Sequence, residues 1–258
     1  MESYRITVVI PLYNKVIGLY NRLLFMSRCD ENLVKFIIVD HDSNDGSSEI
    51  AKKFCESKKN FQYIWIPNID KNPSEPRNIG LKLCDTDYIV FCDADDIIIP
   101  NNYEYIISIM DNNPNICCWA GPYCHSRVLT YNDSEYGLYL EYDIKYRNFK
   151  YCNIIDNIKF PTFLLNGDVF RKNHIHHKWR NEMQEDMLFG MEYLWNCKMS
   201  EYVYHDIEHC VYVYNNEYQQ RVHEYDQMLN GRNYIEYTFE LMKKYHPEFE
   251  EFLKRNRN

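Results

Sequence analysis

Short apolar runs alternate with helical patterns along the first hundred residues of the chain. Runs of β-branched and aromatic residues predict buried strands at Ile6–Ile10, Phe36–Val39, Phe61–Ile66 and Tyr88–Cys92. Helical spacing of apolar residues predicts a helix after each of the first three strands, at Lys15–Ser27, at Ser47–Cys55 and from Glu75 through Leu83. Ser47 or Ser48 is the expected N-cap of the second helix.

This alternation predicts an α/β fold with a mostly parallel central sheet flanked by helices. Right-handed crossovers place the carboxyl ends of such strands along one edge of the sheet, where open α/β sheets bind their ligands. The segments Pro11–Tyr13, Asp40–Asp45 and Asp93–Asp96 each follow a predicted strand. We therefore expect these three segments to be neighbours in space.

The pattern is looser after Asn101. It predicts a helix to about Met110, strands at Ile116–Ala120 and Phe163–Leu165, a turn at Asn166–Arg171, a helix through Leu188 and Leu194, and strands at Tyr202–Tyr204 and Cys210–Tyr214. From Gln219 the chain is expected to be helical to its end, with a break near Pro247. An apolar stripe at Ile235, Phe239, Met242 and Tyr245 is expected to pack on the body of the protein rather than on lipid.

The length of 258 residues fits one large α/β domain followed by a helical extension. We assign residues 1–215 to the domain and residues 216–258 to the extension. A formal net charge of −9 gives no global electrostatic basis for binding nucleic acid. Several of the ten cysteines lie in apolar runs and none forms a C-x-x-C pair, so we expect reduced thiols. No apolar run reaches the roughly 18 residues of a membrane span, and we expect a cytoplasmic protein.

The candidate chemistry begins at Asp93-Ala94-Asp95-Asp96, directly after the fourth strand. Three carboxylates in four positions repel one another unless a cation compensates them, and hard divalent cations prefer oxygen ligands. In isolation this cluster is more often an acidic turn before a helix, here one that begins near Pro100. Its place at the binding edge of the sheet favours a metal site. The first loop carries neither a P-loop nor a G-x-G-x-x-G fingerprint, so a bound phosphate would depend on metal.

Two further groups of residues are candidates. Glu185 and Asp186 open a predicted apolar helix, where Asp186 is either a functional carboxylate or an N-cap. His174, His176 and His177 have a spacing that metal ligands use, but no matching cysteine or glutamate frame accompanies them. A surface loop is the favoured interpretation of the three histidines.

The chain resembles the family 2 glycosyltransferases of the GT-A (Rossmann-like) fold. Four features in the same order carry the resemblance: Val8-Val9-Ile10-Pro11-Leu12-Tyr13-Asn14, Ile38-Val39-Asp40 with Asp45-Gly46, Arg77-Asn78-Ile79-Gly80-Leu81, and Asp93-Ala94-Asp95-Asp96. The resemblance is close over residues 5–100 and looser through Gly167–Arg171 and Glu185-Asp186. It implies a nucleotide-sugar half at 1–100 and an acceptor half at 101–215.

The resemblance also implies roles for residues that bind the donor. Pro11 and Tyr13 would line the base pocket, and Asp40 would hydrogen-bond the base. Tyr13 is alternatively an aromatic residue that packs on its own helix. Arg77 would face the sugar or the diphosphate, or alternatively form a salt bridge to Glu75 or Asp85.

In the acidic loop, the resemblance implies that Asp93 faces the ribose and sugar and that Asp95, with Asp93, holds Mn²⁺ or Mg²⁺. Asp96 would support the loop or cap the next helix. The base that deprotonates the acceptor would come from the pair Glu185-Asp186, and we assign it to Asp186.

The chain departs from the family pattern at two places. His41 and Asp42 follow Asp40, where the family commonly has a second acidic residue and a glycine. The family often supplies a histidine to the metal, and the candidates His205, His209 and His223 do not match its pattern cleanly.

The implied activity is inverting transfer of a sugar from a UDP-sugar, with a GDP-sugar less favoured, to a saccharide or lipid-linked acceptor hydroxyl. The implied setting is surface-polysaccharide assembly, with contact at the inner face of the membrane as an open alternative. A sugar-phosphate nucleotidyltransferase would need a Gly-rich, basic first loop, which Pro11–Asn14 is not. A nucleotide-sugar-binding scaffold without turnover also stays open.

Overall fold

The computed structural model describes residues 4–68, 72–114, 116–121, 123–126, 143–145, 163–167, 180, 185–196, 203–205, 212–215 and 234–251. The strands are β1 (Ile6–Leu12), β2 (Val34–His41), β3 (Phe61–Ile66), β4 (Tyr88–Phe91), β5 (Ile97–Ile98), β6 (Cys118–Ala120), β7 (Tyr123–Ser126), β8 (Asp143–Lys145), β9 (Phe163–Asn166), β10 (Val203–His205) and β11 (Tyr212–Asn215). The helices are α1 (Leu19–Met26), α2 (Ser47–Glu56), α3 (Ser74–Lys82), a short 3₁₀ turn η1 (Pro100–Asn102), α4 (Tyr103–Asn112), α7 (Glu185–Asn196) and α9 (Tyr234–Tyr245).

The main sheet has seven strands in the order β10-β6-β9-β4-β1-β2-β3. Strands β4, β1, β2 and β3 are parallel, and β9 runs antiparallel between β4 and β6. The predicted mostly parallel sheet is therefore confirmed. The chain adds β2 and β3 on one side of β1 and then crosses to place β4 on the other side. This reversal of strand order between β1 and β4 is the point where open α/β sheets bind ligands.

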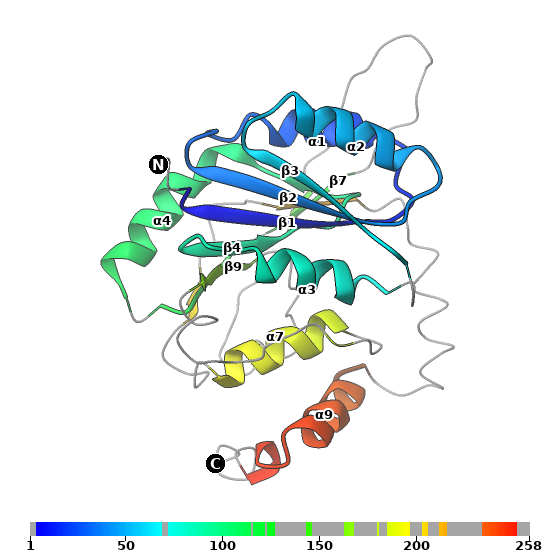
Figure 1. The fold of residues 1–258 in the computed structure, drawn as a ribbon. Helices are drawn as coiled ribbons and strands as arrows, with labels where there is room; N and C mark the ends of the chain where they lie inside the picture. The colour runs from blue at the N-terminus through cyan, green and yellow to red at the C-terminus, as the bar shows by residue number, and fades with distance from the viewer. Residues whose placement is uncertain are drawn as a thin grey trace.

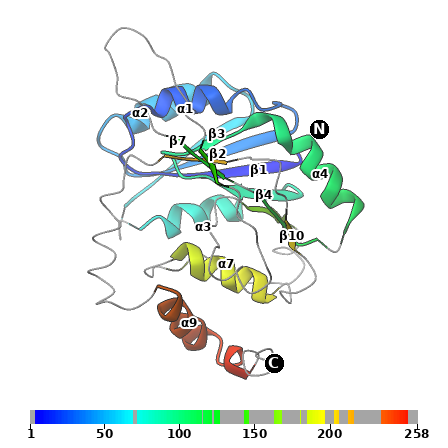
Figure 2. The ribbon, with the colours of Figure 1, turned by 180° about the vertical axis from the view of Figure 1, so that it is seen from behind.

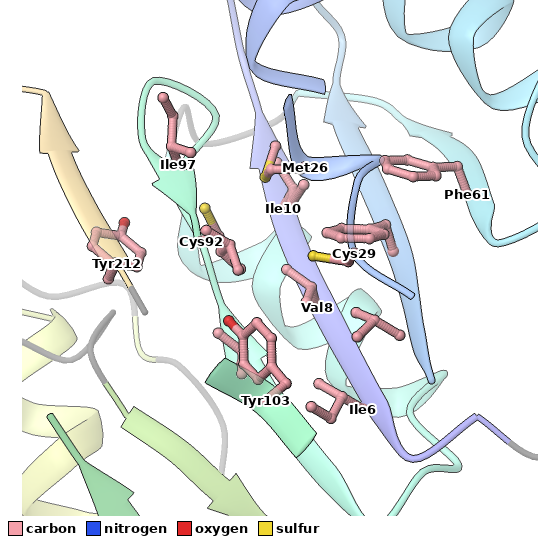
Figure 3. Packing of buried hydrophobic residues seen from close by; sticks show 14 of the residues in the cluster. Ile6, Val8, Ile10, Met26, Cys29, Phe61, Cys92, Ile97, Tyr103 and Tyr212 are labelled. Atoms are coloured by element: carbon pink, nitrogen blue, oxygen red, sulfur yellow. The ribbon is translucent and has the colours of Figure 1, made fainter. Parts of the chain in front are cut away.

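Helices cover both faces of the sheet. Figures 1 and 2 show α1 and α2 on one face, α3 and α7 on the other, and α9 outside α7. The side chains of successive residues in β1 point to opposite faces of the sheet, as in any pleated strand. Ile6, Val8 and Ile10 enter the cluster with α1, α2 and α4, which Figure 3 shows in part, whereas Val9 enters the cluster with α7 and α9.

The helix α9 belongs to the packed body of the protein. Its Met242 and the following Phe249 are buried in one cluster with α7, and Phe239 and Tyr245 pack against that cluster, which confirms the expected packing for three of the four residues of the apolar stripe. The side chain of Ile235 lies outside the described part. A buried carboxylate reinforces this contact: Glu192 of α7 accepts hydrogen bonds from Arg180 at 2.9 Å and from His246 at 2.7 Å. The predicted domain boundary at residue 215 stays a prediction.

Two local predictions were wrong, and one feature of the fold was missed. The first helix begins at Leu19 rather than Lys15, because residues 13–18 form a loop that is bonded to the loop after β2. Neither Ser47 nor Ser48 is the N-cap of α2, because Gly46 takes that place in the left-handed conformation, with φ 97°. A second sheet, in the order β5-β11-β7-β8, had not been predicted, since its strands are only two to four residues long.

The described cysteines Cys29, Cys92 and Cys118 are free and buried, in line with the expected reduced thiols. Among the residues that the structure describes, every helix is too short or too polar to traverse a bilayer.

Candidate active site

Three loops meet at the carboxyl ends of β1, β2 and β4, as the sequence predicts. The loops after β1 and β2 are joined by backbone N–H groups that donate to side chains. Asn14 donates to the Ser43 hydroxyl at 3.0 Å and Lys15 to the Ser47 hydroxyl at 2.8 Å, while Val16 donates to the Asp45 carboxylate at 3.0 Å. The backbone at this edge of the sheet is therefore held in one arrangement.

Both loops contain a residue in the left-handed region: Asn14 has φ 50° and Asp42 has φ 61°. Asn and Asp tolerate this conformation better than other residues with a Cβ, because their short side chains bond locally. The Asn14 side chain bonds the neighbouring loop, since its oxygen accepts the Asn44 N–H at 2.9 Å. The two departures from ordinary backbone geometry thus lie in loops that are bonded to each other at the candidate site, and such strain is concentrated at functional sites of proteins.

The residues expected to bind the base differ in their exposure. Pro11 is buried within β1, and Tyr13 beyond the strand is 37% exposed. The Tyr13 ring meets the His41 ring edge-on, with centroids 6.5 Å apart. An aromatic ring held at its edge and open to solvent offers a face on which a flat base can stack.

Asp40 is fully buried, and the protein itself occupies its oxygens. Oδ1 accepts the Ser43 N–H at 3.0 Å, and Oδ2 accepts the Tyr63 hydroxyl at 2.6 Å and the Ser48 hydroxyl. Burial, together with the bond to Asp40, raises the pKa of Tyr63 to about 12, which keeps this donor protonated. Asp40 thus holds the loop after β2 in place, and a base reaches it only if this loop rearranges.

Arg77 connects the acidic loop to α7. Arg77 is 5% exposed, and its guanidinium donates to Asp93 at 2.6 Å and to Glu185 at 3.0 Å. Burial acts to lower the pKa of Arg77, but the two carboxylates outweigh it and raise the pKa above its usual range. A permanently charged arginine therefore lies between two segments that are about a hundred residues apart in sequence.

The salt-bridge partners considered for Arg77 from the sequence lie elsewhere: Asp85 pairs with Lys35, and Glu75 approaches His41 at 3.8 Å.

Asp186 is the second residue of α7, beside Glu185. Its pKa is raised from 3.8 to about 6, first by burial and then by the negative charge of Glu185. The backbone N–H of Met187 and the charge of Arg77 oppose the rise. A carboxylate with a pKa near 6 is ionised at neutral pH and is still basic enough to accept a proton.

The acidic loop brings the carboxylates of Asp93, Asp95 and Asp96 within 4.8 Å of one another. Asp93 and Asp95 are half-buried. Oxygen donors of this charge and spacing fit Mg²⁺ or Mn²⁺. Asp96 is buried and accepts the hydroxyl of Tyr212, so it ties the acidic loop to the second sheet. In Figure 3, Tyr212 lies across from Cys92 and Ile97, the residues on either side of this loop.

Asp95 has a partner that the sequence did not indicate. The Lys15 ammonium lies 2.5 Å from Asp95 Oδ2, across the point where strand order reverses. Tyr63 and Tyr212 were missed in the same way, because each bonds a site carboxylate from another strand and belongs to no local motif.

Several predicted positions lie outside the described residues. These are Asp168–Arg171 of the expected turn and the histidines His174, His176, His177, His209 and His223. His205 ends β10, but its side chain is also outside the described part.

The family model for Glycosyl transferase family 2 matches residues 7–172. This span contains the three loops of the site together with Arg77, and it ends before Glu185.

The curated relatives include the poly(ribitol-phosphate) beta-N-acetylglucosaminyltransferase TarP of Staphylococcus aureus, 26% identical over 206 residues, which are 75% of this chain and 58% of TarP. A Haemophilus influenzae protein described as an uncharacterized glycosyltransferase is 30% identical over 113 residues, which are 44% of this chain and 45% of that protein. The chain therefore spans less than two thirds of the length of these relatives.

Solved structures share the fold. TarS 1-349 of S. aureus in complex with UDP-GlcNAc matches with a TM-score of 0.66 at 17% identity, over 91% of this chain and 69% of that chain. The mannosyltransferase PcManGT of Pyrobaculum calidifontis in complex with GDP-Man and Mn²⁺ matches with a TM-score of 0.59 at 13% identity, over 84% of this chain and 59% of that chain. The GT-A fold expected from the sequence is confirmed.

Proposed function

Given that the chain belongs to glycosyl transferase family 2, we propose that it transfers a sugar from a UDP-sugar to a hydroxyl of a saccharide or lipid-linked acceptor, with inversion at the anomeric carbon. The observation that carries the proposal is the Arg77 bridge between Asp93 and Glu185. Its two terminal nitrogens bind Asp93 of the proposed donor site and Glu185, the residue next to the proposed base Asp186.

In this proposal the donor lies across the ends of β1, β2 and β4. Pro11 and Tyr13 line the base pocket, with the exposed face of Tyr13 as the stacking surface. Asp40 accepts a hydrogen bond from the base after its loop rearranges, and Asp93 faces the ribose and sugar. The TarS complexes with UDP and UDP-GlcNAc support a UDP-sugar, and the GDP-Man complex of PcManGT keeps a GDP-sugar as the less favoured donor.

Asp95 and Asp93 are the residues that would hold Mn²⁺ or Mg²⁺, since their half-buried carboxylates offer the hard oxygen ligands that these ions prefer. When bound, the ion would neutralise the negative charge that develops on the departing diphosphate. The Mn²⁺ in the PcManGT complex supports this assignment. Arg77 fixes Asp93, and Tyr212 fixes the neighbouring Asp96, so the protein orders the loop before any ligand arrives.

Inversion needs a single in-line displacement, so the base must face the anomeric carbon from the side opposite the diphosphate. Asp186 takes the proton of the acceptor hydroxyl while the oxygen of that hydroxyl forms the new bond to the anomeric carbon. The bond from the anomeric carbon to the nucleoside diphosphate breaks in the same step. Glu185 assists without accepting that proton: its negative charge raises the pKa of Asp186, and its bond to Arg77 fixes the start of α7.

We propose that the reaction belongs to the assembly of a surface polysaccharide in the cytoplasm, with contact at the inner face of the membrane as an open alternative. The name of TarP, which acts on poly(ribitol-phosphate), supports an acceptor of polymeric type. The donor sugar and the linkage are left to experiment.

The test is a screen of UDP- and GDP-sugars with Mn²⁺, in which nucleotide binding and UDP release are both measured. Asp95→Ala is expected to lose the Mn²⁺-dependent part of UDP binding. Asp186→Asn is expected to keep that binding and to lose transfer on the order of 10²-fold or more. Asp85→Asn, which removes an exposed carboxylate paired with Lys35, is the matched control and should change neither. Binding without turnover across a broad acceptor panel would identify a scaffold instead of an enzyme.

A further inference from the structure

The Lys15–Asp95 ion pair has no role in the function proposed above. The two residues are 80 positions apart in sequence, and their charged atoms are 2.5 Å apart. Lys15 lies in the loop after β1, and Asp95 lies in the loop after β4. The pair therefore spans the crevice at which the strand order reverses, where a diphosphate would lie.

The three carboxylates of the acidic loop have partners of unequal mobility. Arg77, which holds Asp93, and Tyr212, which holds Asp96, are 5% and 0% exposed. The Lys15 side chain is 19% exposed and ends in a compact ammonium on a flexible stem. Of these three partners, Lys15 is the one that can leave its carboxylate without disturbing the core.

The backbone of Lys15 is not free to move in the same way. Its N–H donates to the Ser47 hydroxyl at 2.8 Å, and the N–H groups of Asn14 and Val16 also donate to the loop after β2. Any displacement of the ammonium is therefore a rotation of the side chain, while the backbone of Lys15 stays in place. The same loop carries Tyr13, on which the proposed function stacks the base, two residues before Lys15.

We propose that Lys15 is the built-in counter-cation of Asp95. Its ammonium neutralises Asp95 in the metal-free chain and turns onto the donor diphosphate when nucleotide and divalent ion arrive together. This inference rests on the proposed function, which places both ligands in this crevice. An ammonium and a divalent ion repel each other at one carboxylate, whereas a phosphate oxygen is a strong acceptor for the displaced ammonium.

The proposal couples two binding events. A divalent ion alone must displace Lys15 into water, which weakens its binding. A diphosphate gives the ammonium a new anionic partner, which strengthens the binding of the ion, and the coupling is reciprocal. A transferase of this design admits its metal together with the donor.

The experiment titrates Mn²⁺ into the full chain and follows free Mn²⁺ by electron paramagnetic resonance, without and with UDP. Lys15→Gln is expected to bind Mn²⁺ alone on the order of tenfold tighter than the wild type and to bind UDP with Mn²⁺ on the order of tenfold more weakly. Lys15→Arg, which keeps the charge, should restore most of the coupling. Lys35→Gln removes a lysine whose partner is the exposed Asp85 and should leave both affinities unchanged.

Opposite changes in the two affinities support the proposal. If Lys15→Gln weakens both, Lys15 only maintains the structure of the loop, and if it changes neither, Lys15 has no part in binding; either result overturns the proposal. If the wild type binds no UDP at any Mn²⁺ concentration, the proposed donor site is wrong. The affinity for Mn²⁺ alone tests the Lys15–Asp95 pairing separately, because it needs no nucleotide. If Lys15→Gln leaves that affinity unchanged, the pairing is rejected as well, so failure of the donor site and failure of the pairing are distinguishable.

Discussion

Replacing Asp186 by Asn is expected to make the protein more stable and to slow transfer strongly. The substitution keeps the shape of the side chain and removes its charge. In the folded chain the pKa of Asp186 is raised from 3.8 to about 6, chiefly by burial and then by Glu185. The folded state therefore binds a proton more readily than the unfolded state, and holding the ionised form costs stability.

The sign and size of this stability cost follow from the difference in the pKa of Asp186 between the folded and unfolded states. Below 3.8 both states are protonated and the cost is absent; it grows as the pH rises toward about 6 and is constant above that value. The full difference corresponds to at most about 3 kcal/mol, and we expect about 1–3 kcal/mol because the side chain is half-buried. Asn carries no such cost at any pH.

Urea denaturation of both proteins, from about pH 5 to about pH 8, measures this gain. The free energy of unfolding of Asp186→Asn should exceed that of the wild type most near pH 8 and less near pH 5. Transfer should fall on the order of 10²–10⁴-fold with UDP affinity unchanged, and the wild-type kcat/KM, which reports groups of the free enzyme, should rise through about pH 6 as Asp186 ionises. A variant that transfers at the normal rate, or that is less stable than the wild type near pH 8, would refute the assignment.

Three further substitutions test the framework of the site. Arg77→Met leaves two partly buried carboxylates without their shared arginine and should cost about 3 kcal/mol in unfolding free energy, a loss that adding Glu185→Gln should partly relieve. Tyr212→Phe removes the hydroxyl bonded to a buried aspartate, and calorimetry should show a loss of about 1–3 kcal/mol together with weaker Mn²⁺–UDP binding. Gly80→Ala would place a methyl group 2.3 Å from Val9 Cγ1, and thermal unfolding should show a loss of about 1–3 kcal/mol, whereas an unchanged melting temperature would mean that α3 can move away from β1.

The framework of the sheet could be predicted from the sequence because its first four strands are mostly apolar runs, rich in β-branched and aromatic residues. Val8 and Val9, for example, are both buried, on opposite faces of a helix-covered sheet, so apolar residues follow one another along β1 instead of alternating with polar ones. The short strands of the second sheet give no such signal. β5, at Ile97–Ile98, has two residues and is formed by pairing with β11.

The candidate site was predictable in its residue types and less so in its contacts. The motifs indicated Asp93, Asp95 and Asp186, but the Lys15–Asp95 pair depends on how two distant loops meet, which no local pattern encodes. The burial of Asp40 has the same origin, because Tyr63 reaches it from the neighbouring strand β3. Strand neighbours and loop contacts are tertiary facts, and they decide whether a carboxylate faces a ligand or the protein.

The most direct test of the proposed site is a crystal structure with an intact UDP-sugar and Mn²⁺, with the ion located by its anomalous scattering. We expect the base on Tyr13, the ion at Asp93 and Asp95, and the anomeric carbon between the diphosphate and Asp186. An ion bound away from the acidic loop would contradict the account. So would Asp186 on the same side of the sugar as the diphosphate.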